Sequence, residues 1–273
     1  FTALGIGKLI SQNRLTLDTK MSALDSAFHT FIDPEATILQ LLTHTSGIFD
    51  YYDEEVIEDF DNFFVDIPWY NLASPSDYWP LFEGQPMKFV PGTRFSYSNG
   101  GYTFLSLLIE RLSNCPFHTF IADEILTPAG MNDSGFFAFN VLPLNTAYGY
   151  LADRQTTNIF NLPIRGAGDG GMYTTVLDMQ TFWTSLFADQ ILGKELTQTF
   201  LDTHHPFDDV MGYGCGIYKY LDNRCYFIEG SDAGVEFLSR FYPNSQHTIT
   251  IISNVTDGNH QIDQQIQTLL NLG

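Results

Sequence analysis

Hydrophobic positions recur with helical spacing over much of the first two thirds of the chain. The clearest run covers residues 104–112, where apolar side chains fill most positions. Thr37 is placed to cap a helix over 38–42, because a threonine side chain accepts a hydrogen bond from the first helical turn. These patterns predict a mostly helical subdomain, with the loops of a functional site, over approximately residues 20–205.

The last third of the chain has a different pattern. Residues 213–220, 225–231, 235–242 and 248–255 are strand-like, and short turn sequences separate them. Short connections join antiparallel neighbours. A helical stretch over 261–272 closes the chain, and we expect its apolar stripe to cover the sheet. The stripe consists of Ile262, Ile266, Leu269 and Leu270.

These elements together predict an α+β fold, in which an antiparallel sheet flanked by helices accompanies a mostly helical subdomain. We expect one domain over residues 1–273, with the C-terminal sheet and its covering helix at 206–273. The length of 273 residues and the apolar fraction of 44% are sufficient for one large core.

The charge and the cysteines exclude several classes of function. The formal net charge of −20 repels phosphate backbones, so nucleic-acid binding is not expected. No apolar run is long enough to span a membrane. The three cysteines are an odd number without a CxxC pair, which argues against a disulfide framework or a zinc knuckle. We predict no metal and no cofactor, and the oligomeric state stays open.

Three further features have two interpretations each. The acidic and aromatic stretch 50–84 is either a substrate wall or the core of a helical subdomain, and the two stay open. His44 stands beside two hydroxyl residues, but a hydrogen-bonded structural histidine at a helix end is favoured over a catalytic one. The glycine-rich stretch 166–175 lacks the ending of a phosphate loop and favours close backbone packing, with Thr174 or Thr175 capping the next helix.

Tyr97 and Asn99 are the candidates for chemistry. They lie two residues apart, after the turn sequence Pro-Gly-Thr at 91–93 and before two glycines and the apolar helix. A phenol and a carboxamide at that spacing point to the same side of the chain. The position favours a site at the mouth of the helical region.

In order and spacing, seven segments resemble the serine β-lactamase-related hydrolases, which include class C β-lactamases, penicillin-binding DD-peptidases, D-aminopeptidases and related esterases. The segments are FTALGIGKLI, LTLD, TILQLLTHTSGI, PGTRFSYSNGGYTFLSLLIE, ILTPAGMNDS, GAGDGGMYTT and EGSDAGVEF. The resemblance implies acyl transfer through a serine in a Ser-x-x-Lys motif. It also implies that Tyr97 is a general base and that Asn99 orients the substrate.

The resemblance further places the family's third motif, on a sheet edge strand, at Ile228, Glu229 and Gly230. The backbone N–H of Ser231 would then form half of the oxyanion hole. Glu229 either bonds a substrate amine or faces solvent. Ile228 occupies a position that usually holds a cation, so one group that could lower the pKa of the Tyr97 phenol is missing.

No Ser-x-x-Lys is present, because none of the five lysines has a serine three residues before it. In the family this motif comes directly before a tract like residues 1–4, and residues 1–10 read as helix interior without a cap. We therefore expect that the nucleophile belongs to a segment preceding this sequence, together with strands of the sheet.

The resemblance implies a serine hydrolase or acyltransferase that acts on a peptide, β-lactam or ester carbonyl. The alternative is a catalytically inactive relative that binds a peptide or cell-wall-like ligand, which the residue Ile228 favours. The family is common outside the bacterial membrane, but a cytoplasmic location stays open.

Overall fold

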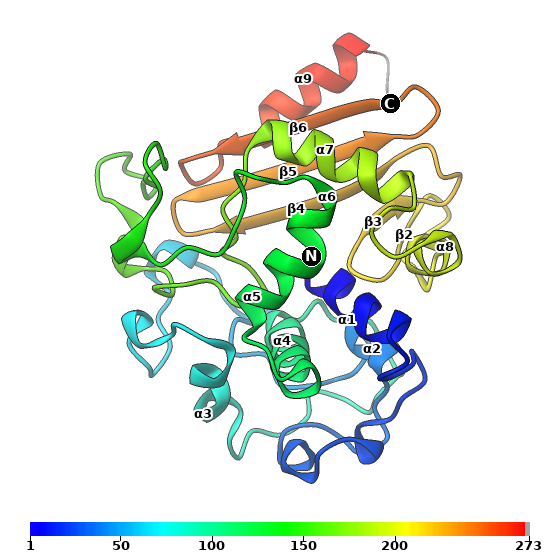
Figure 1. Cartoon of the computed structure of the whole chain (residues 1–273). Coiled ribbons are helices and arrows are strands. Elements are labelled where there is room, and N and C mark those ends of the chain that lie inside the picture. Colours follow the sequence, from blue (N-terminus) through cyan, green and yellow to red (C-terminus); the bar gives the residue numbers. More distant parts are fainter. Residues whose placement is uncertain (271–273) are drawn as a thin grey trace.

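A computed structural model describes residues 1–270, apart from the side chains of His29 and His260. It places an antiparallel sheet beside a helical subdomain (Figure 1), which confirms the predicted α+β class. The helices are α1 (Thr2–Ser11), α2 (Ile38–Leu42), α3 (Trp79–Phe82), α4 (Asn99–Ser113), α5 (Phe117–Ile121), α6 (Thr127–Ala129), α7 (Val176–Phe187), α8 (Lys194–Leu201) and α9 (His260–Leu270). The strands are β1 (His205–Pro206), β2 (Met211–Tyr213), β3 (Tyr218–Tyr220), β4 (Tyr226–Asp232), β5 (Val235–Tyr242) and β6 (His247–Ser253).

The strands follow one another in the sheet in the order β1 to β6, and each neighbouring pair is antiparallel. β4 pairs with β5 along its whole length, from Tyr226 to Asp232. β3 pairs with β4 only at Tyr226 and Phe227. Within residues 1–270, the rest of β4 therefore has no strand on its second side, and this free edge faces the helical subdomain's loops.

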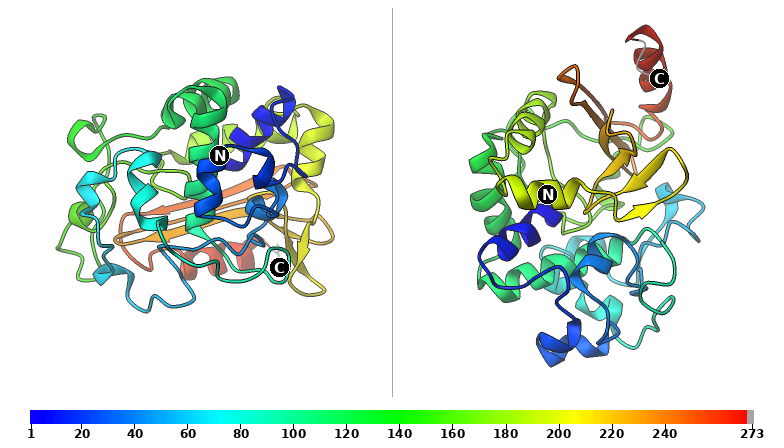
Figure 2. Two further views of the ribbon diagram at one scale, coloured as in Figure 1. Left: turned by 90° about the horizontal axis from the view of Figure 1, so that it is seen from below. Right: turned by 90° about the vertical axis from the view of Figure 1, so that its right-hand side faces the viewer.

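Helices cover both faces of the sheet. α7 packs on one face, where the Trp183 ring stacks on Phe241 and its Nε1 donates a hydrogen bond to Ser239 Oγ at 2.8 Å. α9 lies on the opposite face (Figure 2, right). There, Asp263 forms an ion pair with Arg240 of β5, at 3.1 Å. The alternation of strand residues thus gives β4 one face toward α7 and the main core and one toward α9.

Two expectations about the last third were wrong. The stretch 213–220 is not one strand, because Gly216 adopts a left-handed φ of 76° and a turn separates β2 from β3. The apolar stripe of α9 does not cover the sheet as a whole, because Ile262, Leu269 and Leu270 are exposed. Only Ile266 of the four packs on the sheet, since α9 turns its buried Asp263 toward Arg240.

Local signals for the helices were correct. Thr37 caps α2 as half of a capping box, in which Gln40 N–H donates to the Thr37 hydroxyl at 3.2 Å and Thr37 N–H donates to Gln40 Oε1 at 2.9 Å. Thr175 caps α7 by accepting from Asp178 N–H at 3.1 Å. In the part of the chain that the structure describes, no helix is both long and apolar enough to cross a bilayer.

Candidate active site

The turn that leads into α4 holds Tyr97 and Asn99. Ser98 caps the helix by accepting from Gly101 N–H at 2.9 Å. The buried carboxylate of Asp50 accepts from the N–H groups of Asn99 and Gly100 at 2.9 and 2.8 Å. Negative charge and hydrogen-bond acceptors at a helix N-terminus both stabilise its first turn. Asp50 therefore fixes the start of α4 from another segment, although burial raises its own pKa to about 6.

Glycine is required directly after Asn99. A Cβ added at Gly100 would lie 2.5 Å from the carbonyl oxygen of Phe49, which is closer than real Cβ contacts. The loop that carries Asp50 consequently packs against the backbone of the turn, and Gly100 permits this close approach.

The amide of Asn99 has a defined orientation. Its Nδ2 donates to the carbonyl oxygen of Tyr52 at 2.9 Å and to Glu54 Oε1 at 3.1 Å. Both partner atoms are oxygen acceptors, so the amide atom that faces them must be the donor Nδ2 and not Oδ1. Among the described residues no group donates to Asn99 Oδ1, so this oxygen is available to accept from a ligand N–H.

Tyr52 connects the turn to the end of β4. Its carbonyl oxygen accepts from Asn99, and its hydroxyl donates to Asp232 Oδ1 at 3.1 Å. Asp232 is the last residue of β4, so the bridge joins the start of α4 to the free edge of the sheet. Burial raises the pKa of Asp232 to about 7.

The third-motif residues occupy this free edge. Ile228 is half-buried and packs against the main core, on the face of β4 that also carries Asp232. Glu229 and Ser231 are exposed and alternate onto the α9 face, opposite Leu238 and Glu236 of β5. The Glu229 side chain therefore does not point to the same face as Ile228.

The backbone N–H of Ser231 points to the free edge of β4. A two-residue connection joins β4 to β5, so Asp232 and Val235 form the pair that closes the hairpin. Hydrogen-bonded and non-hydrogen-bonded pairs alternate along an antiparallel ladder, and the pair that closes a two-residue hairpin is hydrogen-bonded. The next pair, Ser231 and Glu236, is therefore not hydrogen-bonded, so the Ser231 N–H points away from β5 and toward the free edge. Gly230 has no atom within 4 Å of an added Cβ, so the face of β4 that carries Ile228 and Asp232 is open at that residue.

The surroundings of Tyr97 raise its pKa. The side chain is half-buried, and burial is the largest cause of the increase above the ordinary value near 10. Among the neighbouring groups, Tyr218 and the carboxylates Glu54 and Asp169 raise the pKa further. Burial also raises the pKa of Asp169, whose carboxylate accepts a hydrogen bond from the Tyr51 hydroxyl. A base at this position needs a cation to oppose these effects.

The start of α1 lies close to these residues. The Thr2 hydroxyl donates to the carbonyl oxygen of Gly168 at 2.6 Å, next to Asp169 in the glycine-rich stretch. A Cβ at Gly168 would lie 2.1 Å from the carbonyl oxygen of Tyr102 in α4, so this stretch is packed as closely as expected. α1, the glycine-rich stretch and α4 thus meet at one place, where Figure 1 shows the first residue between the sheet and the helices.

The stretch 50–84 contributes both to the core and to the site. Tyr51, Trp69 and Tyr78 are buried in the core, whereas Phe64 and Tyr70 are exposed. No pattern in the sequence singled out Asp50, Tyr52 and Glu54, which form hydrogen bonds with Asn99. The acidic and aromatic composition of the stretch was the one signal in the sequence that pointed to these residues. It does not identify their hydrogen-bond partners, which lie about 45 to 180 positions away in the chain.

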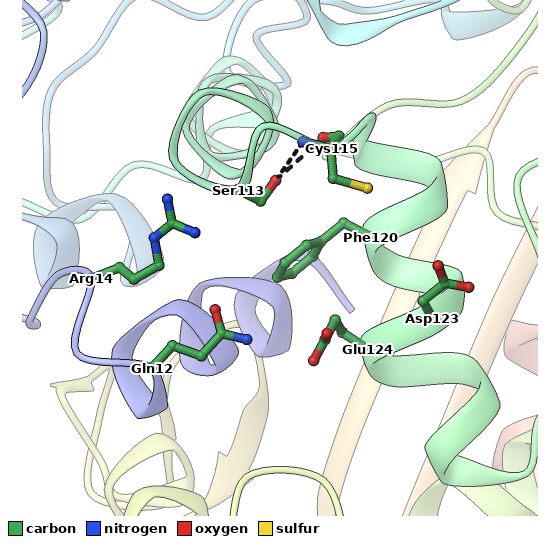
Figure 3. Close-up of a pocket in the computed structure, with 7 residues that line it drawn as sticks. All are labelled: Gln12, Arg14, Ser113, Cys115, Phe120, Asp123 and Glu124. Atoms are coloured by element: carbon green, nitrogen blue, oxygen red, sulfur yellow. Dashed lines mark hydrogen bonds between the residues drawn. The ribbon is translucent and has the colours of Figure 1, made fainter.

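A separate surface pocket lies at the other end of α4. It has a volume of about 210 Å³. Figure 3 shows its side chains coming from the C-terminal ends of α1 and α4 and from the helical segment after α4. Tyr97 and Asn99 lie at the opposite, N-terminal end of α4, so this pocket is not the candidate active site. It is lined by Gln12, Arg14, Ser113, Cys115, Phe120, Asp123 and Glu124.

The chain is similar to several proteins whose sequence or structure is known. A curated relative, penicillin-binding protein 4* of Bacillus subtilis, is 30% identical over 233 residues, which is 79% of this chain and 49% of that protein. The crystal structure of a penicillin-binding protein from Bacillus halodurans has 38% identity and a TM-score of 0.91, covering 98% of this chain and 83% of that one. An octameric penicillin-binding protein homologue from Pyrococcus abyssi has 26% identity and a TM-score of 0.82, covering 99% and 63%.

This chain spans about half the length of the curated relatives that it matches. The sequence model of the beta-lactamase family, however, matches almost all of it, from residue 1 to residue 270. Together with the Tyr-x-Asn turn beside the free edge of β4, this match confirms the resemblance seen in the sequence: the chain belongs to the beta-lactamase family.

Proposed function

We propose that the intact protein is a serine hydrolase or acyltransferase that acts on a peptide, β-lactam or ester carbonyl. The observation that supports this most is the placement of Tyr97 and Asn99 at the start of α4, joined through Tyr52 to the free edge of β4, in a chain of the beta-lactamase family. A carbonyl group bound along that edge would lie between the Tyr97 phenol and the Ser231 N–H, which could supply proton transfer and oxyanion stabilisation.

The proposed roles combine the family resemblance with the contacts of Asn99 and β4. Asn99 Oδ1 accepts from an N–H of the substrate, while its Nδ2 remains bound to Tyr52 and Glu54. The Ser231 N–H stabilises the negative charge that develops on the carbonyl oxygen. Tyr97 removes the proton of the nucleophile and passes it to the leaving group. The mechanism also needs a serine nucleophile and a lysine beside Tyr97, and this sequence has no Ser-x-x-Lys to provide them.

Covalent labelling of the intact protein tests the proposal. A fluorescent penicillin or a fluorophosphonate is expected to attach to one serine, because both reagents trap an activated serine as an acyl or phosphonyl adduct. Mass spectrometry of the labelled peptide gives the position of the adduct. An intact polypeptide without Ser-x-x-Lys, or one that folds without being labelled by either reagent, would show the protein to be a binding member of the family instead.

The variant Ile228→Lys tests whether the missing cation limits the site. The Ile228 side chain shares its face of β4 with Asp232, so a lysine there extends toward the helical subdomain. A cation lowers the pKa of a nearby phenol, and each unit requires about 1.4 kcal/mol of differential stabilisation. We expect the acidic-side pKa of the kcat/KM profile to fall by about one unit and acylation at pH 7 to be faster.

Ile228→Met is the matched control, because it changes the side-chain shape without adding charge. Its pH profile is expected to coincide with that of the wild type. If the lysine variant also keeps the wild-type profile, the site does not need a cation at this position.

A further inference from the structure

His44 contacts the chain on both sides of Tyr97. Its carbonyl oxygen accepts from Ser96 N–H at 2.9 Å, and its ring Nδ1 accepts from Ser98 N–H at 3.0 Å. The centre of its imidazole ring lies 4.2 Å from the centre of the Tyr97 ring. His44 alone therefore fixes the backbone before and after Tyr97, and it also contacts the Tyr97 side chain.

The hydrogen bonds of the ring determine its tautomer. A backbone N–H is only a donor, so Nδ1 carries no proton and Nε2 carries it. Nε2 lies 3.1 Å from the Tyr213 hydroxyl, which accepts this hydrogen bond. Burial lowers the pKa of His44 to about 3, which keeps the imidazole neutral and its Nδ1 free to accept.

The backbone of His44 adopts an unfavourable conformation. Its φ of 55° lies in the left-handed region, which few residues other than glycine adopt. Such conformations persist where surrounding structure holds them, and they are concentrated at functional sites. The side chain is only 2% exposed, so it does not reach a substrate itself.

We propose that His44 is a positioning residue, whose neutral ring and carbonyl oxygen together hold the Tyr97 phenol in the place where it transfers protons. This inference rests on the proposed function, because that function gives Tyr97 the role of base. The action passes through Ser96, Ser98 and the ring contact with Tyr97. Loss of the Nδ1 acceptor should therefore slow the chemical step more than it weakens substrate binding.

Two variants of the intact protein separate the hydrogen bond from the ring. His44→Phe keeps a flat ring but removes the acceptor. His44→Asn removes the ring but places Oδ1 where Nδ1 stood, because both atoms are bonded to Cγ, and asparagine also suits the left-handed backbone. With p-nitrophenyl acetate as substrate, we expect kcat of the phenylalanine variant to fall about 100-fold while KM changes by less than about threefold. The asparagine variant is expected to keep kcat within about tenfold of the wild type.

Amide hydrogen exchange gives a readout that does not depend on turnover. Ser98 N–H is expected to exchange at least about tenfold faster in His44→Phe than in the wild type or His44→Asn. Ser96 N–H stays protected in all three, because its acceptor is the backbone carbonyl oxygen. If His44→Phe does not fold, His44→Gln replaces it, since its amide reaches toward Tyr213 but leaves Ser98 without the acceptor.

Wild-type kcat in folded His44→Phe, equal losses of kcat in the phenylalanine and asparagine variants, or unchanged Ser98 exchange would each overturn the inference. A wild-type protein that neither hydrolyses the ester nor reacts with a fluorophosphonate would contradict the proposed function instead. In that case faster Ser98 exchange in His44→Phe would still support His44 as the residue that fixes the turn, and unchanged exchange would overturn it.

Discussion

Replacing Tyr97 by phenylalanine in the intact protein is expected to lower kcat/KM by about 10²- to 10⁴-fold, the range typical for removal of a positioned general base. The melting temperature should change little. The phenylalanine ring keeps the contact with His44, and no group in residues 1–270 forms a hydrogen bond with the hydroxyl that is removed. Steady-state kinetics and thermal unfolding, measured on the same preparation, check both parts.

Tyr226→Phe is the matched control for this experiment. Its hydroxyl donates to Asn223 Oδ1 at 3.0 Å, at the start of β4 and away from the free edge. Loss of that hydroxyl should leave turnover unchanged. Wild-type turnover in Tyr97→Phe would remove Tyr97 from the mechanism and leave it a packing residue of the turn.

Asp263→Ala is expected to destabilise the protein by about 3–5 kcal/mol, because it leaves the charge of Arg240 buried and unpaired. The Arg240 guanidinium donates to both carboxylate oxygens at 3.1 Å, and the two side chains are only 12% and 6% exposed. Asp263 is also the main buried contact of α9 with the sheet, since Ile266 is the one member of the apolar stripe that packs there.

Thermal unfolding measures this effect, and a fall of the melting temperature by roughly 6–20 °C corresponds to the expected loss at this chain length. Glu35→Ala removes the exposed pair with Lys20, whose side chains are 68% and 52% exposed. That control should cost less than about 1 kcal/mol, because solvent screens exposed ion pairs. Similar melting temperatures for the two variants would mean that α9 is not held by the buried pair.

The sequence predicted those parts of the fold that depend on neighbours in the chain. The caps at Thr37 and Thr175 were readable because the donor and the acceptor stand three residues apart. Three of the four predicted strands were close to correct, because their alternation and turns are local signals. The fourth failed at Gly216, where a single left-handed residue interrupts a pattern that otherwise favours a strand.

The stripe on α9 shows why amphipathic spacing alone can mislead. Spacing identifies which residues share a face, but it does not decide which face meets the sheet. Here the face of α9 that contacts the sheet carries Asp263, which forms a buried ion pair with Arg240. Three of the four apolar residues are exposed. The ion pair has no sequence signal, because its two partners lie 23 residues apart on different elements.

By itself, the sequence determined the fold class, the membership of the beta-lactamase family and the two residues Tyr97 and Asn99 as the candidates for chemistry. These follow from local patterns and from motifs whose order is written in the chain. Only the tertiary structure decided what supports them: Asp50 at the start of α4, Tyr52 between Asn99 and Asp232, and His44 on both sides of Tyr97. The reason is physical, since hydrogen bonds between residues about 45 to 180 positions apart depend on how the chain folds back on itself and leave no periodic pattern in its sequence.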